Sequence, residues 1–256
     1  MPLLNLRLVK PKMLIDLNGI PGLDDVDEIS GGLSVGAMTR QSKVERSPLV
    51  REKHPVLAEA IRHVGHVAIR HRGTIGGSLV HADPAAELPA IALALDAKFE
   101  TVRNGTARTI PAEEFFIDYW TTALGPDEIL KKVVFPDRGR SSGYAVEEIA
   151  RRHGDFAIAG VVAIVDLDQS NKIADARVAL FGLAPTAVRA RRLEQALEGQ
   201  APDLNVIRDA AALLDNVFDP PSDIHASSSY RKRVATVLTV RALLRAVQRC
   251  LERRSQ

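Results

Sequence analysis

The chain has 256 residues, of which 46% are hydrophobic and 26% charged, and its 34 basic residues nearly balance 32 acidic ones. This length fits one large domain or two small ones at roughly 150 residues per domain, and the composition can build a core, which excludes wholesale disorder. The formal net charge of +2 gives no global attraction to nucleic acid or membranes. The single cysteine, Cys250, excludes a disulfide framework, and also an iron–sulfur cluster or Cys-rich zinc site held by this chain alone.

The cysteine count and the hydrophobic pattern also predict the cellular compartment of the protein. One cysteine is typical of a reduced, cytoplasmic setting. No apolar run reaches the roughly 18 residues that a membrane helix needs, and the opening residues form too short an apolar stretch for a signal peptide. We therefore expect a cytoplasmic protein with no membrane span.

The first half of the chain predicts short strands and helices separated by glycine-containing turns. Strands are expected at 13–17, 33–37, 98–102 and 129–135, and helices at 55–64 and 111–116. Asp83-Pro84 is a helix-start signal, with an acceptor at the N-cap and proline at the first helical position. Pro89 indicates that this helix resets there and runs through Ala97.

The polar stretch 136–143 is the best domain boundary, giving domains at 1–137 and 144–251. Beyond it, strands at 144–150, 157–168 and 174–183 predict an antiparallel sheet, and helices follow at 186–197, 203–215 and 229–251. The apolar residues of the last helix step by three and four, which predicts a packing face made of Val237, Val240, Leu244, Val247 and Leu251. Arginines at every fourth residue (241, 245 and 249) indicate a solvated face, and no aromatic residues interleave them as nucleic-acid binding would require.

The most informative stretch is the glycine-rich segment 73–78, Gly-Thr-Ile-Gly-Gly-Ser. Its three glycines free the backbone to approach a ligand, and successive N–H groups with the hydroxyls of Thr74 and Ser78 would suit a pyrophosphate. A plain glycine-rich turn between two elements is the alternative. The pattern is neither the Rossmann nor the Walker phosphate loop.

Other polar groups have weaker functional interpretations. Ser78, His81 and Asp83 lack the nucleophile-elbow context of a catalytic triad. The histidines at 63, 66, 71 and 81 lack a completing carboxylate motif for metal binding. Segment 151–157, Arg-Arg-His-Gly-Asp-Phe-Ala, is either a charged turn entering a buried strand or a loop that offers cations and one ring to a flat anionic ligand.

Segments 73–78, 83–89 and 151–157 together resemble the FAD-binding medium subunit of molybdenum hydroxylases, the family of aerobic carbon monoxide dehydrogenase and xanthine dehydrogenase. Segments 2–8 and 14–17 are similar to the same family, so the resemblance runs over nearly the whole chain. It implies an α+β fold: a two-part FAD-binding domain, followed by a C-terminal domain of a three-stranded antiparallel sheet with helices.

The resemblance also implies a function, that of a flavoprotein oxidoreductase subunit. FAD would take electrons from a two-iron two-sulfur cluster in a small subunit, which a molybdopterin-containing large subunit feeds, and would pass them to NAD, a quinone or another acceptor. The family's second FAD loop matches Thr74, Ile75, Gly76, Gly77 and Ser78. Glu87 matches an acidic cofactor contact, and Leu124 and Phe156 match contacts near the flavin ring.

Two departures from the family accompany the resemblance. Glu148 lies where some members have a cofactor-binding lysine. The family's earlier Gly-Gly-x-Ser loop would precede the segment matched by residues 1–8, so the first part of the FAD domain is expected to be N-terminally incomplete. The alternative interpretation is therefore an FAD-less remnant or scaffold subunit. The substrate, the acceptor and the oligomeric state stay open.

Overall fold

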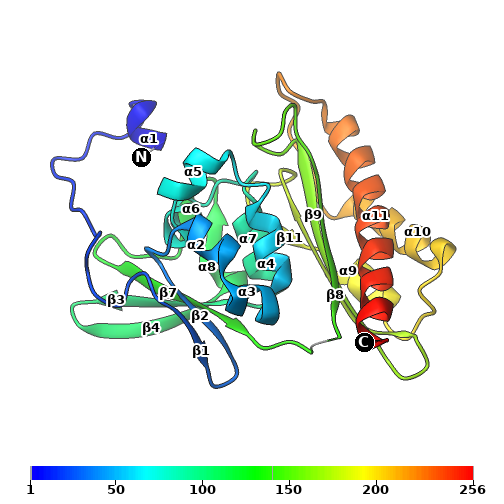
Figure 1. Cartoon of the computed structure of the whole chain (residues 1–256). Coiled ribbons are helices and arrows are strands. Elements are labelled where there is room, and N and C mark those ends of the chain that lie inside the picture. The colour runs from blue at the N-terminus through cyan, green and yellow to red at the C-terminus, as the bar shows by residue number, and fades with distance from the viewer. Residues whose placement is uncertain (1, 140, 256) are drawn as a thin grey trace.

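The computed structural model describes residues 2–139 and 141–255, which form two antiparallel sheets with helices between and outside them (Figure 1). The first sheet has the strand order β1-β2-β7-β3-β4. Its strands are β1 (Val26–Ile29), β2 (Gly32–Gly36), β3 (Lys98–Arg103), β4 (Thr106–Pro111) and β7 (Ile129–Pro136). The predicted strands at 33–37, 98–102 and 129–135 are thus confirmed to within a residue, while β1 and β4 were not predicted.

Short helices cover one face of this sheet (Figure 1). They are α2 (Gln41–Arg46), α3 (Pro48–Lys53), α4 (Pro55–Ile61), α5 (Val67–Arg72), α6 (Ile75–His81), α7 (Glu87–Ala94) and α8 (Ala112–Phe115). A small hairpin, β5 (Phe116–Asp118) and β6 (Thr121–Thr122), follows α8. Proline at the first position of α3 and α4 supplies the helical backbone angle without requiring an N–H partner.

The second sheet has the strand order β11-β10-β9-β8. Its strands are β8 (Gly143–Ile149), β9 (Ala159–Leu167), β10 (Ile173–Phe181) and β11 (Val188–Arg189). The three predicted strands are confirmed, and the two-residue β11 adds a fourth. The helices after it are α9 (Arg191–Leu197), α10 (Leu204–Ala212), a 3₁₀ turn at Leu213–Asn216 and α11 (Ser228–Arg254).

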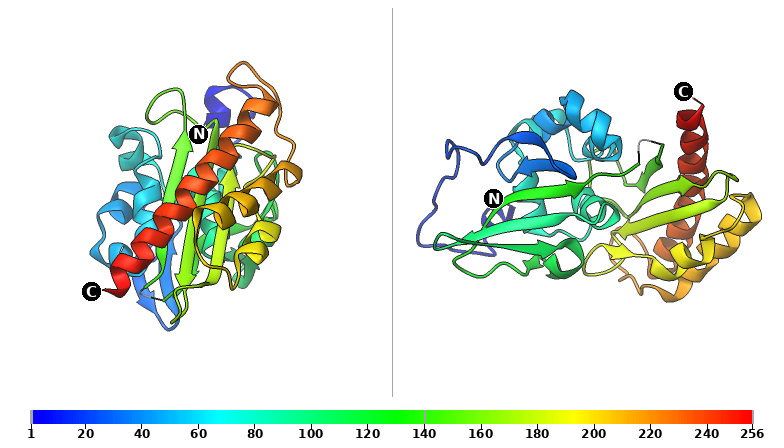
Figure 2. Two further views of the ribbon diagram at one scale, coloured as in Figure 1. Left: turned by 90° about the vertical axis from the view of Figure 1, so that its right-hand side faces the viewer. Right: turned by 90° about the horizontal axis from the view of Figure 1, so that it is seen from below.

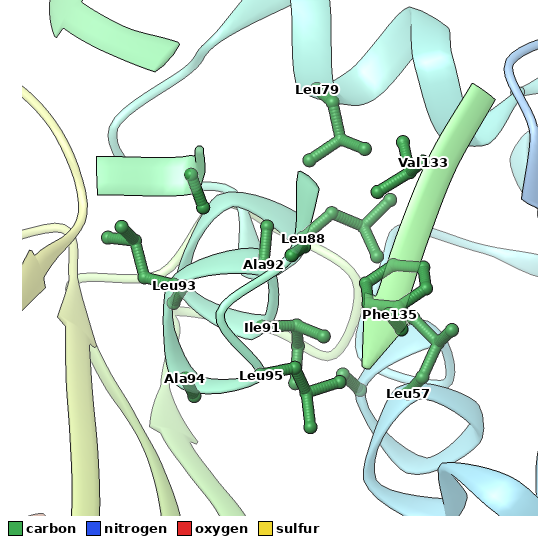
Figure 3. Packing of buried hydrophobic residues seen from close by; sticks show 14 of the residues in the cluster. Leu57, Leu79, Leu88, Ile91, Ala92, Leu93, Ala94, Leu95, Val133 and Phe135 are labelled. Atoms are coloured by element: carbon green, nitrogen blue, oxygen red, sulfur yellow. The ribbon is translucent and has the colours of Figure 1, made fainter. Parts of the chain in front are cut away.

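Helix α7 lies between the two sheets, and all eight of its residues are buried. A helix that is apolar on every side is stable only when protein surrounds it. Its Leu88, Ile91 and Leu95 side packs toward Leu57 of α4 and Phe135 of β7 (Figure 3). The same hydrophobic cluster continues into the inner face of the second sheet, so the two halves share one core.

Helix α11 covers the outer face of the second sheet, away from the first sheet (Figure 2). Val240, Leu244 and Val247 of the predicted packing stripe pack against the second hydrophobic cluster, whereas Val237 and Leu251 are exposed. Leu238, Leu243 and several small residues complete the buried face, and the small ones let the helix approach the sheet closely. A Cβ on Gly143 of β8 would collide with the backbone of α11 at Ala246 and Cys250.

The arginines of α11 are not simply a solvated face. Arg245 pairs with Glu147 of β8 at 2.9 Å. Arg249 pairs with Glu59 of α4 at 2.8 Å and donates to the Tyr144 carbonyl. These contacts join α11 to the second sheet and to the first half of the chain.

The strand expected at 13–17 does not form. Met13, Leu14 and Ile15 are exposed by 66–78% in an irregular segment, because no strand among the described residues lies beside them to pair with. Within the described ranges, no helix combines the length and the apolar character that crossing a membrane requires.

Candidate functional site

The glycine-rich stretch begins a helix instead of the loop that the sequence predicts. Thr74 is the N-cap, and its hydroxyl accepts a hydrogen bond from the Gly77 N–H at 3.0 Å. α6 ends at His81, and its C-cap Ala82 has a left-handed backbone (φ 51°) that stops the helix. The cap explains the difference, because threonine satisfies an N–H group that a helix would otherwise leave unpaired.

Close packing against Ala37, the residue after β2, explains the glycine at position 76. A Cβ there would lie 2.5 Å from the Ala37 Cβ and 2.7 Å from the Ala37 carbonyl oxygen. The Gly76 N–H donates to that carbonyl at 2.8 Å, and the Ile75 N–H donates to Thr39 at 3.0 Å. The backbone of this turn is therefore hydrogen-bonded to the segment that directly follows β2.

The outer side of the same turn is open. Gly77 is exposed, and its N–H and that of Ser78 both bond to Thr74. The Ser78 hydroxyl has no hydrogen-bond partner among the described residues. A ligand approaching here would meet bare backbone and one free hydroxyl.

The connection from α6 to α7 corrects the predicted helix start. Asp83 does not cap α7; its carboxylate accepts from the Ala85 N–H at 2.9 Å and holds a turn. α7 begins at Glu87, with Pro89 as its third residue, where no N–H partner is required. It ends at Ala94, before the predicted Ala97.

Glu87 is 6% exposed at the start of α7. Burial raises its pKa to about 7, and the nearby carboxylates of Glu148 and Asp83 add to the rise, while His63 opposes it. A carboxyl group with this pKa carries a proton for much of the time near neutral pH, so it can donate as well as accept a hydrogen bond.

A partly buried ion pair beside Glu87 was not identified from the sequence. His63 Nδ1 lies 3.4 Å from Glu148 Oε1, and this hydrogen bond raises the pKa of His63. The other oxygen, Glu148 Oε2, is buried and has no partner within the described parts of the chain. The alternation of β8 could have placed Glu148 toward the first half, but nothing in the sequence pattern paired it with His63.

A cleft of about 460 Å³ lies between the two halves of the molecule. The α6–α7 connection forms one wall, and the loop between β8 and β9 forms another. Its lining includes Pro84, Ala85, Tyr119, Arg151, Phe156 and Arg231. The predicted site is thus only partly assembled around it: Phe156 is in the lining, whereas residues 74–78, Glu87 and Leu124 are not.

Phe156 and Leu124 have different surroundings. The Phe156 ring is 66% exposed in the β8–β9 loop and presents an uncovered aromatic face. Leu124, after β6, is half-buried and packs against the first hydrophobic core.

Arg231 lies buried at the base of the cleft. Its guanidinium donates to the carbonyls of Ile158 and Gly182 and to Asp223, the last at 2.7 Å. Its Nε is buried without a partner in the part of the chain that the structure describes. The burial of Arg231 could have been predicted from the sequence, because Arg231 lies four and seven residues before Ala235 and Leu238, on the buried side of α11.

The two weaker interpretations gain no support from the geometry. His81 Nε2 and Asp83 Oδ2 are 4.0 Å apart. The Ser78 hydroxyl bonds to neither within the described ranges, so no triad is assembled. The described residues contain no group of three or more His, Cys, Asp or Glu side chains placed to hold a metal ion.

The chain matches two family models in succession. Residues 1–138 match the FAD binding domain in molybdopterin dehydrogenase, and residues 144–246 match the CO dehydrogenase flavoprotein C-terminal domain. The chain belongs to this family: it is a flavoprotein medium subunit of the molybdenum hydroxylases, an oxidoreductase subunit with FAD as cofactor.

Relatives of known activity support this placement. The chain is 38% identical over 97% of its length to 6-hydroxypseudooxynicotine dehydrogenase complex subunit alpha of Paenarthrobacter nicotinovorans, covering 84% of that relative. It is 33% identical to the carbon monoxide dehydrogenase medium chain of Hydrogenophaga pseudoflava, covering 98% of this chain and 87% of the other. Among solved structures, quinoline 2-oxidoreductase from Pseudomonas putida 86 matches with a TM-score of 0.93 and 34% identity, covering 98% of this chain and 87% of that one.

The polar groups of the site fit FAD. Buried carboxyl groups at Glu87 and Glu148, one with an unpartnered oxygen, suit the hydroxyls of a sugar-alcohol chain. The free Ser78 hydroxyl can donate to a phosphate, and the absent side chain at the exposed Gly77 lets one approach, although the N–H groups of residues 75–78 are already bonded within the chain. The exposed Phe156 ring suits a flat ring system.

Proposed function

We propose that this subunit relays electrons from an iron–sulfur subunit, through FAD, to NAD, a quinone or another acceptor. The lone cysteine supports the assignment of the cluster to another subunit, because one cysteine cannot ligate a two-iron two-sulfur cluster. The cluster would belong to a small subunit, and the substrate would be oxidised at a molybdopterin cofactor in a large subunit. We place this complex in the cytoplasm.

We assign cofactor contacts to the residues that the sequence singled out. Thr74, Ile75, Gly76, Gly77 and Ser78 would border the pyrophosphate, with Ser78 donating its hydroxyl. Glu87 would bond a cofactor hydroxyl, and Leu124 and Phe156 would pack near the ring system. The observation that carries the proposal is the cleft between the halves, which places an uncovered aromatic ring opposite the connection that leads to Glu87.

FAD, when bound, supplies the redox chemistry, and the chain supplies position and electrostatics. The α6–β2 contact fixes the turn at Gly76, so a bound phosphate would meet a rigid surface. Glu87 holds a proton near neutral pH that it can donate to a cofactor oxygen. The cleft is lined by Arg151 and Arg231 and also by Asp155 and Asp223, and Arg231 is paired with Asp223, so its charges nearly balance.

The test is an absorption spectrum of the purified chain before and after incubation with FAD and desalting. We expect a retained flavin spectrum with resolved shoulders. Phe156→Ala should lose most of the flavin, whereas Ile129→Ala, at an exposed apolar residue of β7, should retain it. The relay is then tested by mixing the flavin-loaded chain with the reduced iron–sulfur subunit and following bleaching of the flavin.

Loss of flavin from the unmodified chain would contradict the proposal and favour the scaffold interpretation. Flavin that stays bound but is not bleached by the reduced partner would contradict the relay alone.

A further inference from the structure

The mouth of the cleft between the two halves carries exposed apolar side chains from three separate segments. They belong to the turn of the β5–β6 hairpin (Tyr119 and Trp120), the β8–β9 loop (Phe156) and the loop before α11 (Ile224). Their exposed fractions are 40%, 49%, 66% and 90% in that order. We call these four residues the cleft rim. Apolar groups gathered at the mouth of a cleft indicate a ligand with an apolar surface.

Each member of the cleft rim is tied to the cleft. Tyr119 and Phe156 line it directly, and both chain neighbours of Ile224 line it as well. Trp120 lies beside Tyr119, with 6.1 Å between the ring centroids. Trp120 also has a left-handed backbone (φ 50°), which a bulky residue seldom adopts and which is common at ligand sites. The β8–β9 loop and the loop before α11 lie at the same end of the molecule (Figure 1).

The charged side chains of the cleft are poorly placed to bind a pyrophosphate. Arg231 is 6% exposed, and its guanidinium already donates to two backbone carbonyls and to the Asp223 carboxylate. Arg151 is accompanied in the lining by Asp155 of the same loop. Two carboxylates thus accompany the two arginines. The diphosphate of a dinucleotide acceptor would gain little net attraction here.

The backbone of the cleft walls is equally unsuited to phosphate. Pro84 and Pro221 have no N–H group. The Ala85 N–H donates to the Asp83 carboxylate, and the Gly182 N–H donates to the Pro84 carbonyl at 2.7 Å. A phosphate nest needs successive free N–H groups that point to one place. These walls therefore favour an uncharged ligand over a pyrophosphate.

We propose that the acceptor which enters this cleft is a quinone, an uncharged flat ring with two carbonyl oxygens, an inference that rests on the proposed relay function. The cleft rim supplies the apolar contact. Tyr119 and His225 line the cleft, and each can donate a hydrogen bond to a quinone oxygen. The Tyr119 hydroxyl has no partner within the described parts of the chain, so it is available for this bond.

The transfer balances as two hydrogens. The quinone gains two electrons and two protons and becomes a hydroquinone, and FADH₂ loses the same electrons and protons on returning to FAD. The substrate of the complex supplies the electrons through the iron–sulfur subunit. Tyr119, His225 and the cleft rim select and orient the quinone, while the bound cofactor supplies the redox chemistry.

The first test uses the full-length, flavin-loaded chain after anaerobic photoreduction, so it does not depend on the iron–sulfur subunit. Stopped-flow mixing with menadione or with NAD⁺ follows the return of the oxidised flavin spectrum. We expect reoxidation that saturates with menadione concentration and is at least about a hundredfold faster than with NAD⁺. Tyr119→Phe should raise the half-saturating menadione concentration about threefold by removing one hydrogen bond. Ile224→Glu should raise it about tenfold, because it adds a charge that an apolar ligand must desolvate.

The second test measures binding without turnover. Trp120 is the only tryptophan of the chain, so its fluorescence reports what happens at the cleft rim. Titration of the oxidised, flavin-loaded chain with menadione should quench this fluorescence to saturation, and NAD⁺ should not. Val237→Glu, at an exposed apolar residue of α11, is the matched control for Ile224→Glu and should behave as the unmodified chain in both tests.

Circular dichroism and flavin content check that each variant is folded and loaded. Faster, saturable reoxidation by NAD⁺ would overturn the inference and leave the relay intact. Reoxidation that rises linearly with menadione concentration and is unchanged in both variants would also overturn it, because such behaviour marks unspecific collision. Loss of flavin from the unmodified chain would contradict the proposed function and the inference together. Saturable menadione reduction by a chain that the reduced iron–sulfur subunit cannot bleach would support the inference while contradicting the relay.

Discussion

Glu87 combines deep burial with an ionisable group, and this has a cost that depends on pH. Its native pKa of about 7 lies above the ordinary value of 4.5. Between these two values the native state keeps the proton while the unfolded chain releases it. The free energy of unfolding therefore falls as pH rises through this interval, and the penalty is complete above pH 7.

Glu87→Gln removes this penalty while keeping the size and polarity of the side chain. We expect the variant to be more stable than the unmodified chain by about 2–3 kcal/mol well above pH 7, and nearly equal in stability near pH 4.5. Urea unfolding followed by circular dichroism at the two pH values measures the difference. Glu114→Gln, at an exposed carboxylate on α8, is the control. A stability difference that does not change with pH would show that Glu87 is ionised in the native state.

At the scale of the elements, α6 offers two adjacent glycines with different constraints. Gly76→Ala forces its new methyl group against Ala37, the residue after β2, and both backbones must shift, so we expect a loss of about 2–3 kcal/mol. In Gly77→Ala the methyl group meets only the Thr74 hydroxyl at 2.7 Å, so the loss is limited to the cap, about 1 kcal/mol. Urea midpoints measure both, with Gly125→Ala, which has no neighbour closer than 3.6 Å, as the control. Equal losses at 76 and 77 would contradict the packing explanation.

The elements that the sequence predicted well are those whose local pattern and tertiary packing agree. The first seven residues of β9 are an apolar, buried run because helices cover both faces of its sheet. Segment 13–17 has a similar local pattern, yet it lacks a neighbouring strand to pair with, and local pattern cannot supply one. The packing stripe of α11 was predicted only in part, because Ala246 and Cys250 make the close contact with β8, while Val237 and Leu251 at the ends of the stripe stay exposed.

The candidate site, too, was predicted only where a local motif marked it. Motif resemblance pointed to residues 74–78, Glu87 and Phe156, and it also noted Glu148. The His63–Glu148 pair joins segments 85 residues apart in the chain, and the packing of α7 between the sheets brings them together. Such a contact follows from topology, which no spacing along the chain encodes.

At the scale of the whole molecule, a charged junction joins the two halves beside their shared core. Asp96 follows α7 with a left-handed backbone (φ 49°) and receives hydrogen bonds from Arg177 of β10 and Arg189 of β11. Arg189 is almost fully buried and also donates to the Leu93 carbonyl at 2.9 Å and to Glu194. The carboxylate of Asp96 in one half therefore pairs with two arginines of the other half, which are also paired with Asp175 and Glu194.

Asp96→Asn isolates the charge at this junction, because asparagine tolerates the left-handed backbone and keeps one acceptor oxygen. The buried Arg189 loses part of its compensation, and Asp96 is itself partly exposed, so we expect a loss of about 1–2 kcal/mol of unfolding free energy. Asp127→Asn is the matched control: its carboxylate is equally exposed but pairs with the exposed Arg103 inside one half, and its removal should cost less than about 0.5 kcal/mol. Urea unfolding of both variants near neutral pH makes the comparison. Equal effects would mean that the Asp96 pairs behave as ordinary surface ion pairs, and that the shared hydrophobic core alone holds the halves together.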